Sequence, residues 1–544
     1  MAQHVDLSAR LLAAADDASR QLNQPAIDAR RIDDAITNAI DPRKLIDNFA
    51  EAWRTTNDMA RAILETHGFA TALSRLAVDA RAGVCPDEIE SAPLANTDRY
   101  LLAEGRIAAR AFSPTFAEPL RAPRQVADGV ESAVRAFLSG AEEDALGVLY
   151  RQDVSDYMNH WLATDAPTID GYIRQHFGTD GPRYMINSGI GANEQFNYFV
   201  SEVANSRPDR RVTWLLANSP RDILYLPADA TVHNTLFVEF SRSGITQETV
   251  KQHELTPRGA KRIVFANSGP LLDLAKRDGN LILELPSEVS GRYGRNKTPI
   301  LMAPMYISGL DVPAYWATID TACRAMPLSD PASLPVVAAR YIRTQQLRRG
   351  INHIYLGAND PRLLRSADEF CQFWNEGVNR DGNDMTMSRY LGLPRDSHMN
   401  LEAILGTSEH KLAIFLLRTG NPARHDGMKA PNPMPTGHPL LLAGADAIDS
   451  AHKGLTAADV DLILALANVK RCSEKMPTLL ITVDAPSLEA SAWLGQLWAD
   501  ITLVYSRLIG VDAGSNPEVK AVRTRAAQWL ADKGAAMNLL SQRS

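Results

Sequence analysis

Hydroxyl side chains, an arginine and a glycine are grouped in the run Ser241 to Thr249, which reads S-R-S-G-I-T-Q-E-T. An apolar segment of β type, Thr235 to Phe240, precedes this run, and a segment compatible with a helix follows it. Backbone N–H groups and the positive potential of a helix N-terminus attract anions, and Gly244 permits close backbone approach. The hydroxyls can donate further hydrogen bonds to phosphate oxygens. Because the G-x-x-x-x-G-K-[ST] spacing is absent, the run predicts a site for a small phosphorylated ligand rather than a nucleotide.

The elements that would position this loop are short apolar runs alternating with helix-like stretches. The first series comprises 184–187, 212–216, 236–240, 263–266 and 281–285, and the second comprises 351–356, 412–417 and 478–483. This alternation predicts an α/β protein with two doubly wound parallel-sheet domains, each in three layers α/β/α. Ligands of such sheets bind beyond the carboxyl ends of the strands. The loops after Ile186, Phe240 and Leu285 therefore lie where a site is expected.

The pattern divides the chain into four predicted parts. They are a helical N-terminal region at 1–165, a first α/β domain with the phosphate loop at 166–330, a second α/β domain at 331–515, and a C-terminal helical segment at 516–544. The N-terminal region carries Ala, Leu, Arg and Glu at helical spacing and shows no cluster of strands. Residues 333–349 are expected to form a helix between the domains, 421–439 a loop, and 518–540 the last helix.

Composition restricts the function further. A chain of 544 residues is expected to fold as two or three domains, and a net charge of −7 argues against general binding of nucleic acid. The four cysteines are scattered without a C-x-x-C pair, so neither a zinc site nor a redox motif is expected. No apolar run is long enough to cross a bilayer, and the first residues do not resemble a signal peptide. We therefore expect a cytoplasmic protein that binds neither nucleic acid nor membrane.

Six short motifs, taken in order, resemble those of the phosphoglucose isomerase family, which is built from sugar isomerase (SIS) domains. Asn187–Gly191 resembles that family's N-I-G-I-G turn, the run Ser241–Thr249 its S-x-S-G-x-T-x-E-T phosphate loop, and Ser290–Tyr293 its G-G-R-[YF] motif. Gln372–Glu376 resembles Q-L-W-A-E of the bacterial branch, Ser397–His398 the Gln-His pair before a strand, and Pro517–Arg523 the segment P-G-V-E-A-G-K. Each motif alone is weak, but the ordered set, over residues 184 to 525, is specific.

The resemblance implies an aldose–ketose isomerase that interconverts glucose 6-phosphate and fructose 6-phosphate through a cis-enediolate, without metal or cofactor. It assigns the proton transfer to Glu376, and a carboxylate is chemically suited to that task. Gln372 lies four residues earlier, on the same face of a helix, and would bind substrate. Without the resemblance, Glu376 would be interpreted as an ordinary solvated carboxylate on a helix.

The resemblance gives three further side chains a catalytic role. Arg292 would stabilise the negative charge of the enediolate, although a surface arginine in a turn is the ordinary alternative. His398 would open the sugar ring, in its own or the partner's site, although a lone histidine is more often structural. Arg523 stands where the family has a lysine that helps ring opening, and Lys520 is an alternative counterpart.

The resemblance also implies a set of phosphate-binding residues and a homodimer with the site near the subunit interface. The predicted set is Gly189, Gly191, Ser241, Arg242, Ser243, Gly244 and Thr246, with Thr249 as an uncertain addition. The alternative for the hydroxyl run is a helix N-cap with adjacent hydroxyls.

Several positions around the expected ligand depart from the family pattern. Ala192 and Asn193 stand where Gly-Ser is usual, so one phosphate-binding hydroxyl is absent, and Arg242 replaces the common lysine. These differences suit a divergent glucose-6-phosphate isomerase, similar to the part fused to transaldolase in some bacteria. They also leave open an isomerase of another anionic hexose, such as a 6-sulfo derivative, and a non-catalytic phosphosugar-binding protein.

Overall fold

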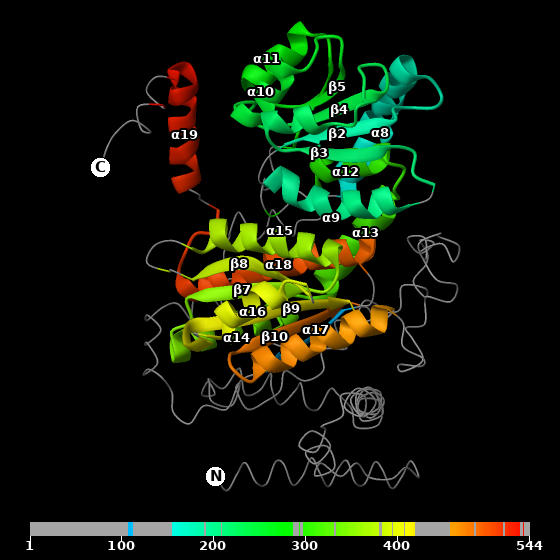
Figure 1. Ribbon diagram of the computed structural model, residues 1–544. Coiled ribbons are helices and arrows are strands. Elements are labelled where there is room, and N and C mark those ends of the chain that lie inside the picture. The colour runs from blue at the N-terminus through cyan, green and yellow to red at the C-terminus, as the bar shows by residue number, and fades with distance from the viewer. Residues whose placement is uncertain are drawn as a thin grey trace, which may run out of the picture. The chain divides into compact units, whose positions relative to one another are not determined.

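Two five-stranded sheets, each covered by helices on both faces, form the described part of this computed structural model (Figure 1). The structure describes residues 107–112, 155–189, 192–207, 209–286, 293, 297–330, 333–379, 383, 385–393, 395–406, 408–418, 457–483, 486–514, 517–533 and 537. The prediction of two parallel α/β domains is confirmed by these sheets.

The first sheet is entirely parallel, with its strands in the order β3-β2-β4-β5-β6. The strands are β2 (Tyr184–Ser188), β3 (Thr213–Ala217), β4 (Thr235–Phe240), β5 (Lys261–Phe265) and β6 (Leu281–Leu283). The helices are α8 (Ser155–Phe177), α9 (Ala192–Ser206), η2 (Pro220–Tyr225), α10 (Gln247–Leu255), α11 (Gly269–Arg277), α12 (Pro299–Ile307) and α13 (Val312–Ala325). Side chains of α8, α9 and α12 pack on one face, and those of α10 and α11 pack on the other, whereas α13 contacts α12 and α18. Both faces of the sheet are therefore buried, as its continuous apolar strands require.

The second sheet has four parallel strands in the order β10-β9-β7-β8 and one antiparallel strand, β1, beside β10. The strands are β1 (Ile107–Phe112), β7 (His353–Ala358), β8 (Thr386–Gly392), β9 (Lys411–Arg418) and β10 (Thr478–Val483). The helices are α14 (Leu334–Arg349), α15 (Pro361–Gly377), α16 (Ser397–Leu405), η4 (Ser408–His410), α17 (Ala457–Ser473), α18 (Leu488–Ile509) and α19 (Pro517–Ala531). Buried side chains of α14, α15 and α18 meet one face of the sheet, and those of α16 and α17 meet the other.

Helix α18 forms the centre of the apolar core. Its side chains are buried around nearly the whole circumference, which is the pattern of a helix enclosed by protein. It contacts α13, α14, α15 and α9, and the side chains of Trp498 and Phe370 stack with ring centroids 4.3 Å apart. One continuous cluster of buried residues therefore includes side chains from both sheets.

In both sheets the first parallel strand in the chain lies between the second and the third. In the first sheet β2 lies between β3 and β4, and in the second β7 lies between β8 and β9. The chain connections on the two sides of such a strand run in opposite directions along the sheet. The loops at the carboxyl ends of the neighbouring strands are therefore separated by a gap, and a ligand usually binds in this gap. In the first sheet this position lies between the ends of β2 and β4.

Two strands were not predicted from the sequence. The prediction that residues 1–165 are helical is wrong at β1, where I-A-A-R-A-F pairs along its length with β10. Its three alanines give no β-type pattern, so pairing with a distant strand decides the conformation. β8 was also missed because this edge strand, T-M-S-R-Y-L-G, mixes polar and apolar residues without a continuous apolar run.

Of the three predicted boundaries between parts of the chain, one cuts a helix and two lie between helices. The boundary at 165 falls inside α8, whereas those at 330 and 515 fall between helices. The helix expected at 333–349 is α14, with Ser333 at its N-cap position, and the helix expected at 518–540 begins at Pro517 as α19. The loop expected at 421–439 lies outside the described residues. Among the described helices, none is both long and apolar enough to cross a membrane.

Candidate functional site

The phosphate loop, residues 241–246, lies at the carboxyl end of β4, next to the end of β2. Ser188, the last residue of β2, is in register with Glu239 of β4, so Gly189 and Ser241 leave the sheet at the same edge. This edge is where β2 lies between its two neighbours, as a ligand site in a doubly wound sheet requires. Gly191, the other predicted glycine of this turn, lies outside the described residues.

Internal hydrogen bonds give the phosphate loop its shape. The Ser241 hydroxyl donates to Thr246 Oγ1 over 2.9 Å, and the backbone N–H of Gly244 donates to the Ser241 carbonyl over 2.8 Å. Thr246 occupies the N-cap position of α10, but its side chain makes no capping hydrogen bond. Thr246 thus stands where the N-cap alternative expects a hydroxyl but makes no capping bond, and its hydroxyl faces that of Ser241 across the loop.

A second turn, residues 267–269 after β5, holds the phosphate loop from one side. The N–H of Asn267 donates to the Arg242 carbonyl and the N–H of Leu271 to the Gly244 carbonyl, both over 3.0 Å. Gly244 and Gly269 have φ of 62° and 76°, and a Cβ on either would lie 1.8 Å or 2.4 Å from a carbonyl oxygen of the opposite turn. Glycine at 244, predicted to allow approach of a ligand, is thus required for the approach of two backbone turns.

Three buried polar side chains beside the loop make no hydrogen bond within the described residues. They are Asn187, which is 2% exposed and lacks a partner for both amide atoms, Ser188, and Thr249 in the first turn of α10. An unsatisfied polar group is costly to bury, so such groups mark positions where a ligand or a water completes the bonding. Only Thr249 had been considered for this role from the sequence.

Helix α15 positions the predicted base. Its apolar face, which includes Phe370, Phe373 and Trp374, is buried, and Gln372 and Glu376 lie partly buried beside that face. The Gln372 amide donates from Nε2 to Glu376 Oε1 over 2.8 Å, while Gln372 Oε1 is buried without a hydrogen bond. The amide thus orients the carboxylate and keeps an acceptor for a ligand hydroxyl.

Tyr293 connects the S-G-R-Y motif to the C-terminal end of α15. Its ring centroid lies 5.3 Å from that of Phe373, and its hydroxyl donates to the Ala513 carbonyl over 3.3 Å. A Cβ on Gly377 would lie 2.4 Å from the Tyr293 hydroxyl, so only glycine fits directly after Glu376. Arg292 itself lies outside the described residues, but its neighbour in the chain is fixed beside the predicted base.

Contacts between α9 and α15 bring the two halves of the candidate site toward each other. Arg365, near the start of α15, pairs with Glu202, near the end of α9, over 3.0 Å. Earlier in α9, Asn197 donates to the Ile300 carbonyl of α12, on the segment that follows Tyr293. Helix α15, which carries Glu376, therefore packs against α9, which follows the turn at Gly189.

The remaining predicted catalytic residues are located only by their backbone. His398 lies in α16, between β8 and β9, and Arg523 and the alternative Lys520 lie in α19. Their side chains lie outside the described residues, so their roles stay predictions.

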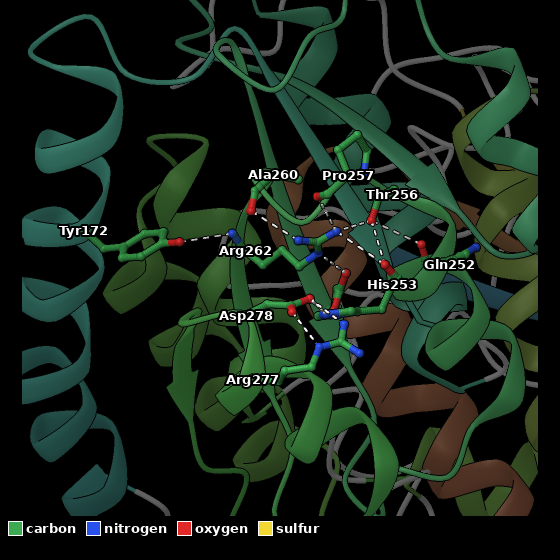
Figure 2. Close-up of polar contacts among 10 residues, drawn as sticks. Tyr172, Gln252, His253, Thr256, Pro257, Ala260, Arg262, Arg277 and Asp278 are labelled. Carbon is green, nitrogen blue, oxygen red and sulfur yellow. Dashed lines mark hydrogen bonds and ion pairs between the residues drawn. The ribbon is translucent and has the colours of Figure 1, made fainter.

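A buried charged network behind the predicted phosphate loop was not predicted from the sequence. Glu239 of β4 contacts His253 of α10 over 2.6 Å, and His253 contacts Asp278 over 3.2 Å through its other ring nitrogen (Figure 2). Arg262 of β5 lies 3.3 Å from Glu239, and Arg277 donates to Asp278 over 2.7 Å. A motif search could not find this set, because its members come from four separate segments.

The Asp278 carboxylate makes the free energy of unfolding depend on pH in the acid range. Hydrogen bonds from Arg277 and His253 lower its pKa from 3.8 to about 2. A lowered pKa means that its contribution to the free energy of unfolding is complete above pH about 4 and is lost as the pH falls toward 2. We expect the stability difference between the wild type and Asp278→Asn to shrink over that range in urea denaturation. A difference that stayed constant from pH 5 to about 2 would contradict this assignment.

Comparisons with known proteins agree with this geometry. No protein-family model matches the chain. A probable glucose-6-phosphate isomerase from Haloarcula marismortui is 26% identical over 272 residues, which are 48% of this chain and 60% of the relative. One of the same description from Halobacterium salinarum is 26% identical over 306 residues, covering 53% of this chain and 66% of the relative. The chain thus spans less than two thirds of the length of either relative.

A solved structure shares the fold. The crystal structure of a glucose-6-phosphate isomerase from Chlamydia trachomatis superimposes with a TM-score of 0.54, covering 75% of this chain and 80% of that one. The sequences are 13% identical, so this likeness concerns the fold alone.

Proposed function

We propose that this chain, a divergent relative of the phosphoglucose isomerase family of sugar isomerase (SIS) proteins, isomerises a sugar phosphate. Glucose 6-phosphate and fructose 6-phosphate are the proposed pair. The observation that carries the proposal is the Gln372–Glu376 pair, an oriented carboxylate at the end of α15, the helix whose Phe373 contacts Tyr293. A phosphate loop at the switch point of the first sheet supports it.

The proposed reaction moves one proton between neighbouring carbons. In the open-chain aldose, Glu376 takes the proton from C2, and the electron pair forms the C1–C2 double bond of an enediolate. The protonated Glu376 then returns a proton to C1, the proton of the C2 hydroxyl passes to the oxygen on C1, and C2 becomes the carbonyl of the ketose. Gln372 donates to a carboxylate oxygen of Glu376 and so orients the carboxylate. No oxidant or reductant is consumed, because the same electrons are redistributed within the sugar.

The other predicted residues complete this scheme. Arg292 is proposed to stabilise the enediolate oxygen, because a guanidinium keeps its charge at any working pH. His398, together with Arg523 or Lys520, is proposed to open the ring before proton transfer. The phosphate would bind to the loop hydroxyls and the N-terminal amides of α10.

The experiment that tests this proposal combines binding with turnover. Calorimetry would measure binding of fructose 6-phosphate, mannose 6-phosphate and a 6-sulfo hexose, and chromatography would follow conversion of each. We expect conversion of fructose 6-phosphate to glucose 6-phosphate. Conversion of only the sulfonate would reassign the substrate, and tight binding of every sugar without conversion would identify a phosphosugar-binding protein instead.

A further inference from the structure

The buried charged network lies directly behind the phosphate loop. Glu239 precedes the loop on β4, and His253 lies in the last turn of α10, which follows the loop. The contact between these two side chains, 2.6 Å long, therefore joins the strand that enters the loop to the helix that leaves it. The contact therefore couples the position of α10 to that of β4.

Both ring nitrogens of His253 lie between carboxylates. Nδ1 is within hydrogen-bond distance of Glu239, and Nε2 is within hydrogen-bond distance of Asp278. The side chains of His253, Glu239 and Asp278 are at most 3% exposed. None of them can reach a ligand in solvent, which excludes a direct catalytic role.

Further hydrogen bonds fix the same end of α10. Arg262, fully buried, donates to the carbonyl oxygens of His253 and Pro257 over 3.4 Å and 3.2 Å and contacts Thr256 Oγ1. Gln252 donates to the Ala217 carbonyl of β3 over 2.9 Å. The C-terminal end of α10 is thus attached to β3, β4 and β5 by polar contacts, as Figure 2 shows for Arg262.

Stability alone does not account for buried charges at this place. Apolar side chains of similar volume often stabilise a core as well as a buried ion pair does. Charged hydrogen bonds, however, have narrow limits of length and direction, whereas apolar contacts permit sliding. A network of this kind suits a helix whose position must be accurate.

We propose that the Glu239–His253–Asp278 network is a positioning device for the phosphate loop. It holds α10 against β4 so that the hydroxyls of Ser241 and Thr246 keep the spacing that binds a phosphoryl group. The inference rests on the proposed function, because it takes that loop as the site of the sugar's phosphate. His253 is accordingly a positioning residue and not a catalytic one.

The test measures inorganic phosphate binding and sugar phosphate kinetics in Glu239→Gln and Asp278→Asn. We expect Glu239→Gln to raise the Kd for inorganic phosphate and the KM for fructose 6-phosphate about tenfold, with kcat changed by less than about threefold. Asp278→Asn, which leaves the Glu239–His253 contact in place, should act in the same direction but more weakly. Circular dichroism would establish that each variant is folded.

A matched control separates positioning from loss of stability. Asp360 is a buried aspartate of the second domain that pairs with Arg362 and Arg418, so Asp360→Asn breaks a comparable ion pair away from the loop. It should leave the Kd for inorganic phosphate unchanged. Wild-type phosphate affinity in a folded Glu239→Gln, or in Asp278→Asn if the first variant does not fold, would overturn the proposal.

The outcomes also distinguish this inference from the proposed function. A wild-type protein that binds inorganic phosphate but isomerises no sugar would overturn the proposed function, and phosphate affinity would still decide the role of the network. A wild-type protein that binds no phosphate would overturn both.

Discussion

Replacing Glu376 by glutamine is expected to lower the turnover of fructose 6-phosphate by about 10²- to 10⁴-fold. The substitution keeps the volume of the side chain but removes the group that accepts the proton. Because the amide of Gln372 can still donate to the oxygen of the new side chain, local structure should be preserved. Binding of sugar phosphate should therefore change little, and the loss should appear in kcat.

Steady-state kinetics and calorimetry on the same preparation measure this effect. Glu409→Gln is the matched control, because Glu409 is exposed in η4, before β9, at the opposite edge of the sheet from the carboxyl ends of its strands. The control should retain wild-type turnover. Near-normal turnover of Glu376→Gln would show that another group takes the proton.

Alanine at Gly244 is expected to weaken phosphate binding by about 100-fold. The added Cβ would lie 1.8 Å from the Ser268 carbonyl oxygen, and a φ of 62° is itself unfavourable for alanine. Backbone cannot move aside as a flexible side chain can, so the two turns must separate. The same argument applies to Gly269→Ala, whose Cβ would lie 2.4 Å from the Ser243 carbonyl oxygen.

Gly178→Ala isolates the contribution of backbone strain. Gly178 has a φ of 72°, but an added Cβ would meet no atom within 4 Å. We expect this variant to lose about 1–2 kcal/mol of stability and to keep wild-type phosphate affinity. If Gly244→Ala bound inorganic phosphate as tightly as Gly178→Ala does, the loop would not be the phosphate site.

Much of the fold follows from local sequence. Strands such as β4 and β9 are short apolar runs between helices, and such runs predict buried parallel strands directly. The shared face of Gln372 and Glu376 follows from their spacing on a helix. The family was found through the order of six motifs, each of which is too short to be specific alone.

Other features depend on contacts between distant segments. β1 forms a strand because β10 offers a free edge, although its alanines suggest a helix. In the sequence, Glu239 is one polar residue in an apolar strand, and His253 is one of several isolated histidines. Their pairing becomes visible only when β4, α10 and α11 are brought together. The closeness of Gly244 and Gly269 likewise needs both turns in place.

The most direct test of the proposed isomerase is proton exchange at the substrate carbons. Fructose 6-phosphate incubated with the protein in deuterium oxide would be followed by NMR at C1 and C2. Proton transfer through an enediolate predicts deuterium at C1 of the ketose and at C2 of the glucose 6-phosphate formed, and Glu376→Gln should abolish both signals. Sugar phosphate that binds but exchanges no carbon-bound proton would contradict the account.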